Sequence, residues 1–206
     1  MNLLVEYQYF PPFTLYKSIC QATHLVFEQY ERFQKMSFRN RLVIGGGNGP
    51  LQLSIPLRSG RDQKTFTREI LIDNSSSWQS RHWKSIVSCY NRSPWFEFFH
   101  DELDQLYKMP YEFLVDWNLA CSRWALQKLH LNLPVSVTDN WKEEYDPKEW
   151  DDWRNRLLPK TIQSMFPEPP KYRQVFMDRT GFIPHLSILD LLFCEGKNAL
   201  NILRQQ

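Results

Sequence analysis

The sequence of 206 residues predicts an α+β fold, in which a small mixed or antiparallel sheet from the N-terminal third is packed by helices from the middle and C-terminal parts. Three observations support this prediction. Short apolar runs separated by turn residues dominate the first third, and apolar residues recur with a helical period in the middle. The 14 Phe, 9 Tyr and 8 Trp side chains suit one bulky core. A chain of this length is expected to form a single domain, residues 1–206.

The first third is expected to contain strands and one helix. Strands are predicted at residues 3–6, 24–28, 38–44, 51–57 and 69–72. Leu15, Ile19 and Ala22 share one helical face, which predicts a helix over 13–22. The glycine-rich residues 45–50 predict a hairpin turn, because they join two strands and lack the Lys-Ser/Thr pair of a phosphate-binding loop.

Helix signals follow in the middle of the chain. Ser76 and Gln79 have the spacing of a capping box, so a helix is expected from there to about Tyr90. Ser93-Pro94 has a capping residue followed by the proline typical of a first helical position. The longest helical pattern covers residues 111–131. A strand is then predicted at 133–137, loops with short helical turns at 138–175, and short helices at 187–193 and 198–204.

The overall charge disfavours a strongly basic nucleic-acid-binding protein. Lys and Arg number 25 against 23 Asp and Glu, which leaves a net charge of +2. Arginines with interleaved aromatic residues would suit a single strand, but the acidic residues 143–152 disfavour it. Nucleic acid is therefore an unlikely partner on sequence grounds.

Compartment and metal signals are weak. The chain shows no basic start followed by a long apolar run and no stretch of 18 apolar residues, so a cytoplasmic protein without a membrane span is expected. The four cysteines lack CxxC spacing, which is typical of buried, reduced thiols. The five histidines show no HExxH or HxH spacing, so no metal site is predicted. The sequence does not indicate a cofactor.

Basic residues concentrate in one segment, whereas acidic residues concentrate in another. Between residues 32 and 61 there are six basic residues and no acidic one: Arg32, Lys35, Arg39, Arg41, Arg58 and Arg61. Residues 143–152 contain six acids and a single lysine. One interpretation is a pocket for an anion, because guanidinium groups grip phosphate or carboxylate. The other is two solvated faces that partly neutralise each other.

Two Arg-Asn-Arg triplets, residues 39–41 and 154–156, are the sharpest polar motifs. On a strand, Arg39 and Arg41 would share one face about 7 Å apart, a spacing that suits a diphosphate. Asn40 would point to the other face and, with Asn155, would orient a ligand. The predicted anion-binding residues are Lys35, Arg39, Asn40, Arg41, Lys84, Arg154, Asn155 and Arg156.

His82 is the predicted general acid or base, because an imidazole titrates near neutral pH and lies on a helix one turn from Trp78. The alternative is a packed, hydrogen-bonded core histidine. Asp190 has two interpretations as well. It would pair with an arginine of one triplet, or it would complete a capping-box-like spacing with Ser187 at a helix start.

Several segments, taken in their order and spacing along the chain, together resemble the WbqC-like protein family. They are residues 7–12 (Tyr-Gln-Tyr-Phe-Pro-Pro), 34–41, 78–90, 154–160 and 172–193. Many members have Gln-Pro where this chain has Tyr7-Gln8. The resemblance covers nearly the whole chain and implies a role in bacterial surface-polysaccharide biosynthesis, of the O-antigen type.

We interpret the chain as an enzyme of sugar-conjugate metabolism, with transferase as the favoured class. An Arg-rich pocket would hold an anionic small-molecule donor, such as a nucleotide-sugar or an acyl donor, and His82 would move the proton. The alternative is a non-catalytic protein-interaction or ligand-binding module, for which the tryptophan-rich residues 141–153 would supply the surface.

Overall fold

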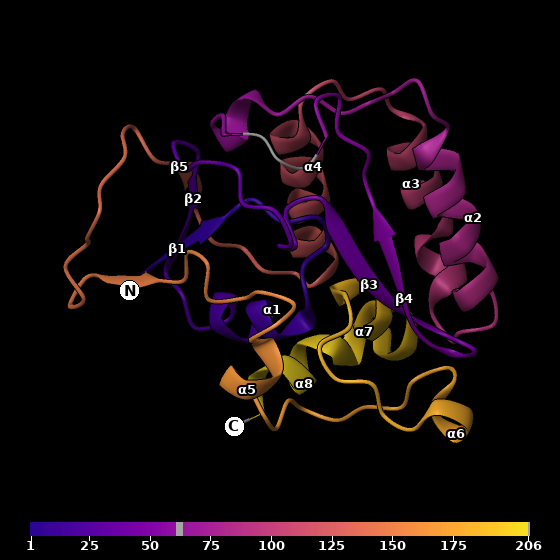
Figure 1. The fold of residues 1–206 in the computed structure, drawn as a ribbon. Helices are drawn as coiled ribbons and strands as arrows, with labels where there is room; N and C mark the ends of the chain where they lie inside the picture. Colours follow the sequence, from indigo (N-terminus) through magenta and orange to yellow (C-terminus); the bar gives the residue numbers. More distant parts are fainter. Residues whose placement is uncertain (61–63, 206) are drawn as a thin grey trace.

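The computed structural model describes residues 1–60 and 64–205, so Arg61 of the basic segment lies outside the described residues. The predicted α+β class is confirmed (Figure 1). Four parallel strands form one sheet in the order β5–β2–β1–β6, namely β1 (Asn2–Glu6), β2 (His24–Glu28), β5 (Val135–Val137) and β6 (Trp150–Asp152). A separate antiparallel hairpin consists of β3 (Arg41–Gly46) and β4 (Gly49–Ser54).

The helices pack around these two sheets. The longer ones are α1 (Phe13–Ile19), α2 (Trp78–Tyr90), α3 (Phe96–Lys108), α4 (Leu114–Lys128), α7 (Ile188–Glu195) and α8 (Ala199–Arg204). The short ones are α5 (Ile162–Met165), α6 (Met177–Thr180) and the 3₁₀ turns η1 (Thr67–Glu69) and η2 (Gly196–Asn198). Among the described residues, every helix is too short or too polar to cross a membrane.

The parallel sheet combines local and distant segments. The unit β1–α1–β2 places two strands in parallel because a helix carries the chain back, as in other parallel crossovers. β5 and β6 come from much later in the chain and pair with β2 and β1 respectively. β6 lies within the acidic residues 143–152, which the sequence predicts as loop. The loop between β5 and β6 arches outward beside the sheet (Figure 1).

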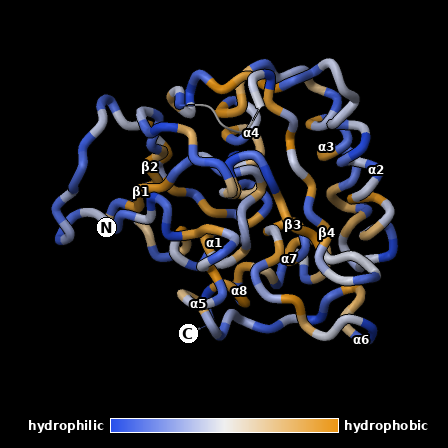
Figure 2. The backbone as a smooth tube through the Cα atoms, in the orientation of Figure 1, coloured by the Kyte–Doolittle hydropathy of each residue, from blue (hydrophilic) through white to orange (hydrophobic). Residues whose placement is uncertain are grey.

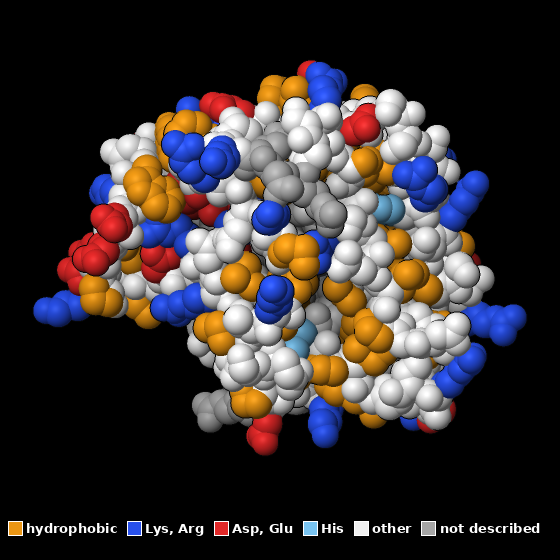
Figure 3. Space-filling view, viewed as in Figure 1, with side chains coloured by type: hydrophobic (Ala, Val, Ile, Leu, Met, Phe, Trp, Pro, Cys, Tyr) orange, Lys and Arg blue, Asp and Glu red, His pale blue; other side chains and the backbone are white. Residues whose placement is uncertain are grey.

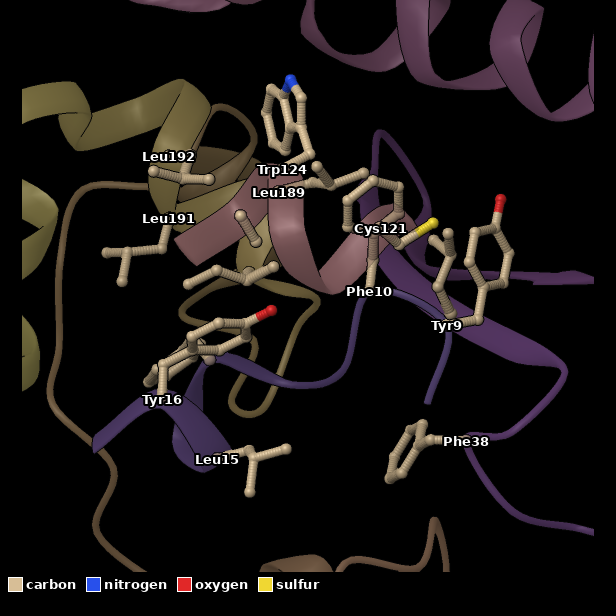
Figure 4. Close-up of a cluster of buried hydrophobic side chains, with 14 of the residues drawn as sticks. Tyr9, Phe10, Leu15, Tyr16, Phe38, Cys121, Trp124, Leu189, Leu191 and Leu192 are labelled. Atoms are coloured by element: carbon tan, nitrogen blue, oxygen red, sulfur yellow. The ribbon is translucent and has the colours of Figure 1, made fainter. Parts of the chain in front are cut away.

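A hydrophobic core joins one face of the parallel sheet to the helices. Figure 2 shows hydrophobic segments along β1, β2 and α7, whereas the loop after β5 is hydrophilic. Side chains from the segment after β1, from α1, α4 and α7 converge in this core (Figure 4), and they include Tyr9, Phe10, Tyr16, Cys121, Trp124 and Leu189. Because each large buried side chain contributes about 2–3 kcal/mol, this convergence holds the sheet to the helices.

The C-terminal residues close the core against the first helix. Pro12 forms an isolated antiparallel bridge with Ser187, and the Ser187 hydroxyl donates to the Phe10 carbonyl at 2.8 Å. The Ser187 side chain also accepts from the Leu189 amide at 3.3 Å, which confirms the predicted cap of α7. α7 packs on α1, α3, α4 and β3, so it belongs to the same core.

Other local predictions differ from the structure. The strand expected at 69–72 is η1 followed by isolated bridges of Leu71 and Ile72. α2 begins at Trp78 after Ser77, and neither this serine nor Trp95 before α3 caps its helix by a side chain. The Ser93 hydroxyl donates to the Tyr90 carbonyl at 2.8 Å, at the end of α2.

Candidate functional site

The carboxyl ends of the parallel strands bring polar residues together at one edge of the sheet. β1 ends at Glu6, β2 at Glu28 and β6 at Asp152, and Thr138 follows β5 directly. Three further polar side chains, from Glu31, Arg39 and Arg154, lie with them. In open sheets with parallel strands, ligands bind outside this edge where the strand order reverses. Here the reversal falls between β1 and β6.

Glu6 is buried and fixed by neighbours from two directions. The Gln8 side-chain amide donates to Glu6 Oε1 at 2.8 Å, and the Asn155 backbone amide donates to Oε2 at 3.0 Å. Arg39 Nη1 lies 3.9 Å from Oε1. Gln8 Oε1 itself is buried and has no hydrogen-bond partner in the described structure.

Glu28 is fully buried at the end of β2. The Thr138 hydroxyl donates to Glu28 Oε1 at 2.9 Å and the Tyr30 backbone amide donates to the same oxygen at 2.7 Å. Arg154 Nη1 lies 3.5 Å from Oε2. These contacts tie the ends of β2 and β5 to the segment after β6.

Glu31 and Arg39 form a buried bidentate ion pair. Arg39 Nε donates to Glu31 Oε1 at 2.8 Å and Nη2 donates to Oε2 at 2.5 Å. Arg39 Nη2 also donates to Asn155 Oδ1 at 2.9 Å. Burial raises the pKa of Glu31, and the charges of Glu6 and Glu28 add to this, whereas Arg39 opposes it. The carboxyl group is therefore held closer to its protonated form than an exposed glutamate.

We call Glu6, Glu28, Glu31, Arg39 and Arg154 the carboxylate cluster. The cluster contains three carboxyl groups and two guanidinium groups, so basic groups are not in excess in it. The two Arg-Asn-Arg triplets do meet here, because Arg39 contacts Asn155. The sequence predicts an open pocket lined by arginines. In the structure, carboxylates pair with the guanidinium groups of Arg39 and Arg154 instead.

A cavity of about 480 Å³ opens beside the carboxylate cluster. It is lined by residues that follow β2, β5 and β6 together with Phe66, namely Tyr30, Glu31, Arg32, Phe66, Trp141 and Asn155. We call it the sheet-edge cavity. Its walls are mainly aromatic, and Glu31, Arg32 and Asn155 supply polar groups. Mostly apolar walls with a few placed polar groups are typical of small-molecule sites.

Two lining residues show signs of a specialised site. Asn155 has a φ of 58°, in the left-handed region that side chains other than glycine rarely adopt. In this conformation its backbone amide bonds Glu6 and its side chain bonds Arg39. Trp141 is 50% exposed, and the Arg154 guanidinium lies 4.6 Å from its ring centroid. Strain and exposed aromatic area of this kind concentrate at binding sites.

Arg32 supplies a guanidinium at the wall of the sheet-edge cavity. Its Nη1 donates to the Lys64 carbonyl at 2.5 Å, and the group lies 5.6 Å from the Phe66 ring centroid. In Figure 3, acidic side chains gather over the loop between β5 and β6.

The remaining predicted ligand residues lie in several places. Arg41 begins β3 whereas Arg39 precedes the strand, so the two arginines do not share a strand face. Arg41 donates to Gln52 Oε1 at 3.1 Å. Asn40 is buried and donates to the Ile55 carbonyl at 3.0 Å, which fixes the hairpin. Arg156 pairs with Asp151 at 3.0 Å.

The lysines predicted with them, Lys35 and Lys84, are exposed, and Lys84 lies on α2. Ligand binding by any of these residues stays a prediction.

His82 lies on α2 and packs in the aromatic core against the rings of Tyr9 and Trp78. Its Nδ1 is 3.0 Å from the Tyr9 hydroxyl, which in turn contacts the Tyr107 hydroxyl at 2.6 Å. Burial lowers the pKa of His82 to about 4, so the imidazole is neutral at pH 7. None of the cavities described between residues 1–60 and 64–205 is lined by it. The surroundings of His82 therefore agree with the alternative interpretation, a packed and hydrogen-bonded core histidine.

Asp190 lies in the first turn of α7 after the capping Ser187, which agrees with the second interpretation of the sequence. Its carboxylate accepts from the Tyr90 hydroxyl at 2.5 Å and from the Tyr172 hydroxyl at 2.7 Å. Burial raises the pKa of Asp190 to about 6. Among the described residues, no arginine of either triplet pairs with Asp190.

Sequence reasoning did not identify Glu6, Glu28 or Glu31 as site residues, and it gave Trp141 only as part of the surface of the alternative, non-catalytic module. The signal was present, because Glu6 and Glu28 each end a strongly apolar run and interrupt its pattern. Recognising their meaning required the parallel pairing of β1 and β2. Among residues 1–60 and 64–205, no group of three or more His, Cys, Asp or Glu side chains is arranged to hold a metal ion.

Comparison with protein families matches residues 7–164 to the WbqC-like protein family. The chain belongs to this family. The match includes β2, β5 and β6 of the parallel sheet but not β1, and it includes every residue lining the sheet-edge cavity. Comparisons with curated proteins and with solved structures gave no match.

Proposed function

We propose that this WbqC-like protein is a transferase of sugar-conjugate metabolism that acts in the cytoplasm on bacterial surface polysaccharide. We propose further that its donor binds in the sheet-edge cavity. One observation carries the proposal. An aromatic-walled cavity adjoins the carboxylate cluster at the edge where parallel strands end, which is where ligands of such sheets bind.

The lining suits a donor with an apolar ring face and polar substituents. The rings of Tyr30, Phe66 and Trp141 offer surfaces for the faces of a sugar or a nucleobase. Asn155 and Glu31 offer hydrogen-bonding groups for hydroxyls. Arg32 is the guanidinium placed to meet the anionic part of a nucleotide-sugar or an acyl donor.

The proton-transfer role moves from His82 to Glu31 in this proposal. Glu31 lines the cavity and has a raised pKa, and both properties are typical of a general acid or base. Arg39 acts as a positioning residue, because its bidentate contact fixes the Glu31 carboxylate and its third contact fixes Asn155.

We also propose that residues 1–206 form one domain. The residues after the family match include α7, which packs on elements from the first half of the chain. Limited proteolysis tests this, because one domain resists cleavage after residue 164 whereas a separable tail is removed.

Isothermal titration with UDP-, dTDP- and GDP-linked sugars and with acetyl-CoA tests the proposed donor site. At least one donor is expected to bind, and Trp141→Ala should weaken it by about tenfold through the lost ring contact. Phe98→Ala is the matched control, because Phe98 is a 72% exposed aromatic residue on α3 away from this cavity.

The proposal fails if no donor binds the intact protein or if Trp141→Ala binds as the parent does. Donor binding without transfer to any saccharide acceptor would favour the alternative, a non-catalytic ligand-binding module.

A further inference from the structure

The outer face of the parallel sheet carries polar side chains at its two ends, on either side of the buried Leu4 and Val26, in contrast to its apolar core face. Strand partners in register point to the same face of a sheet. Asn2 is in register with His24 and Trp150, and Val26 with Ser136, so these side chains share one face. The core face carries Leu3, Val5, Leu25 and Phe27. The same outer face bears Glu6 and Glu28 at its carboxyl end.

A second cavity, of about 290 Å³, lies on this outer face. Parallel sheets almost always have both faces covered. Here the loop of residues 138–149 arches beside the sheet (Figure 1), and residues of that loop line the cavity together with strand residues. We call it the outer-face cavity. A loop thus encloses a hollow on a face that a packed helix would ordinarily fill.

The lining of the outer-face cavity is rich in hydrogen-bonding groups and balanced in charge. Neutral polar groups come from both the strands and the loop, namely Asn2, His24, Ser136, Thr138 and Asn140. Asp139 and Lys142 add one charge of each sign. The rings of Tyr145 and Trp150 form a pair with centroids 4.6 Å apart. Hydroxyl-rich, uncharged ligands with an apolar ring face match this combination.

Arg154 holds the loop that forms the outer wall. Its guanidinium donates to the carbonyls of Lys142 at 2.8 Å and Glu143 at 3.0 Å. It also lies 4.6 Å from the Trp141 ring centroid and 5.2 Å from that of Tyr145. Such a preorganised wall reduces the ordering that a ligand must impose.

The two cavities share this wall. Asn140 and Lys142 line the outer-face cavity, whereas Trp141 between them lines the sheet-edge cavity. We propose that the outer-face cavity is a saccharide subsite, separate from the donor cavity. If the proposed function holds, its occupant is the saccharide acceptor or part of it. The subsite itself rests on the outer-face geometry alone.

Saturation-transfer NMR with methyl glycosides of glucose, galactose and N-acetylglucosamine tests the subsite. Saturation is expected to pass from the protein to the ring protons of at least one glycoside. The double variant Ser136→Ala/Asn140→Ala should reduce the transfer at least fivefold, because it removes polar groups from both strand and loop. Both side chains are exposed, so the fold should be retained.

Phe66→Ala is the matched control, since Phe66 lines only the sheet-edge cavity of the two. Transfer that persists in the double variant, or that is absent for every glycoside in the intact protein, would overturn the subsite. Transfer lost in Phe66→Ala but kept in the double variant would place the sugar in the sheet-edge cavity, which also overturns it. Glycoside binding without any donor binding would uphold the subsite and contradict the proposed function.

Discussion

Replacement of Arg39 by methionine tests a fully buried charge in the site. Arg39 has no exposed surface and makes two charged hydrogen bonds to Glu31, one bond to Asn155 and a 3.9 Å approach to Glu6. Arg39→Met keeps much of the side-chain volume but leaves buried carboxylates without their cation. Breaking a buried pair in this way costs about 3–5 kcal/mol. For a chain of this size that loss lowers the melting temperature by about 6–20 °C.

The pH dependence of the stability lost in Arg39→Met gives a second, independent test. Without Arg39, burial and the neighbouring acids raise the pKa of Glu31 further. A carboxyl group whose pKa is raised by folding binds more protons when folded, so the variant gains stability as the pH falls. The deficit of Arg39→Met should therefore be smaller at pH 5 than at pH 8.

Urea unfolding followed by tryptophan fluorescence measures both effects. Arg156→Met is the matched control, because Arg156 is 44% exposed and pairs with Asp151 at the surface. Such surface pairs contribute about 0–1 kcal/mol. The reasoning is refuted if Arg39→Met loses no more stability than the control, or if its deficit grows as the pH falls.

Three further predictions concern other contacts. Asp190 has a folded pKa of about 6 against 3.8, so its stabilising contribution is complete below pH 4 and is lost as the pH rises through 6, a change of about 3 kcal/mol. Asp190→Asn should remove this decline from urea unfolding between pH 4.5 and 7.5, and an unchanged profile would contradict it. Gly45→Ala would place a Cβ 3.0 Å from Asp190 Oδ2 and 3.2 Å from Leu186 Cδ1, which should cost about 1–3 kcal/mol in thermal unfolding, whereas Gly47→Ala, with its nearest contact at 3.6 Å, should be nearly neutral. Asn155→Gly relieves the positive φ but loses the bond to Arg39, so donor affinity in calorimetry should fall while stability changes by about 1 kcal/mol or less; equal donor affinity would exclude Asn155 from the site.

Local patterns were sufficient to predict much of the fold. The strand at 24–28, the hairpin around the glycine-rich turn and the cap of α7 at Ser187 follow from nearby residues, and the structure confirms them. The pairing of β5 and β6 with β2 and β1 joins segments more than 100 residues apart. No short pattern encodes this pairing. The acidic residues of β6 are typical of a loop, so the strand was predicted as a loop.

The candidate site depended on that distant pairing. An acid-free basic segment favoured an anion pocket, because Glu6, Glu28 and Glu31 stand before it in the sequence and looked unrelated to it. In the fold these acids come together at the sheet edge and engage Arg39 and Arg154. Charge counted along the chain therefore did not reveal that acids engage Arg39 and Arg154, whereas the predicted grouping of Arg39 and Asn155 at one site agrees with their contact in the structure.

A crystal structure with a bound nucleotide-sugar tests the central claim most directly. The account predicts the donor in the sheet-edge cavity, with a ring against Trp141 or Phe66 and its phosphates toward Arg32. A donor bound instead at the hairpin beside Arg41, or over α2 beside Lys84, would contradict it.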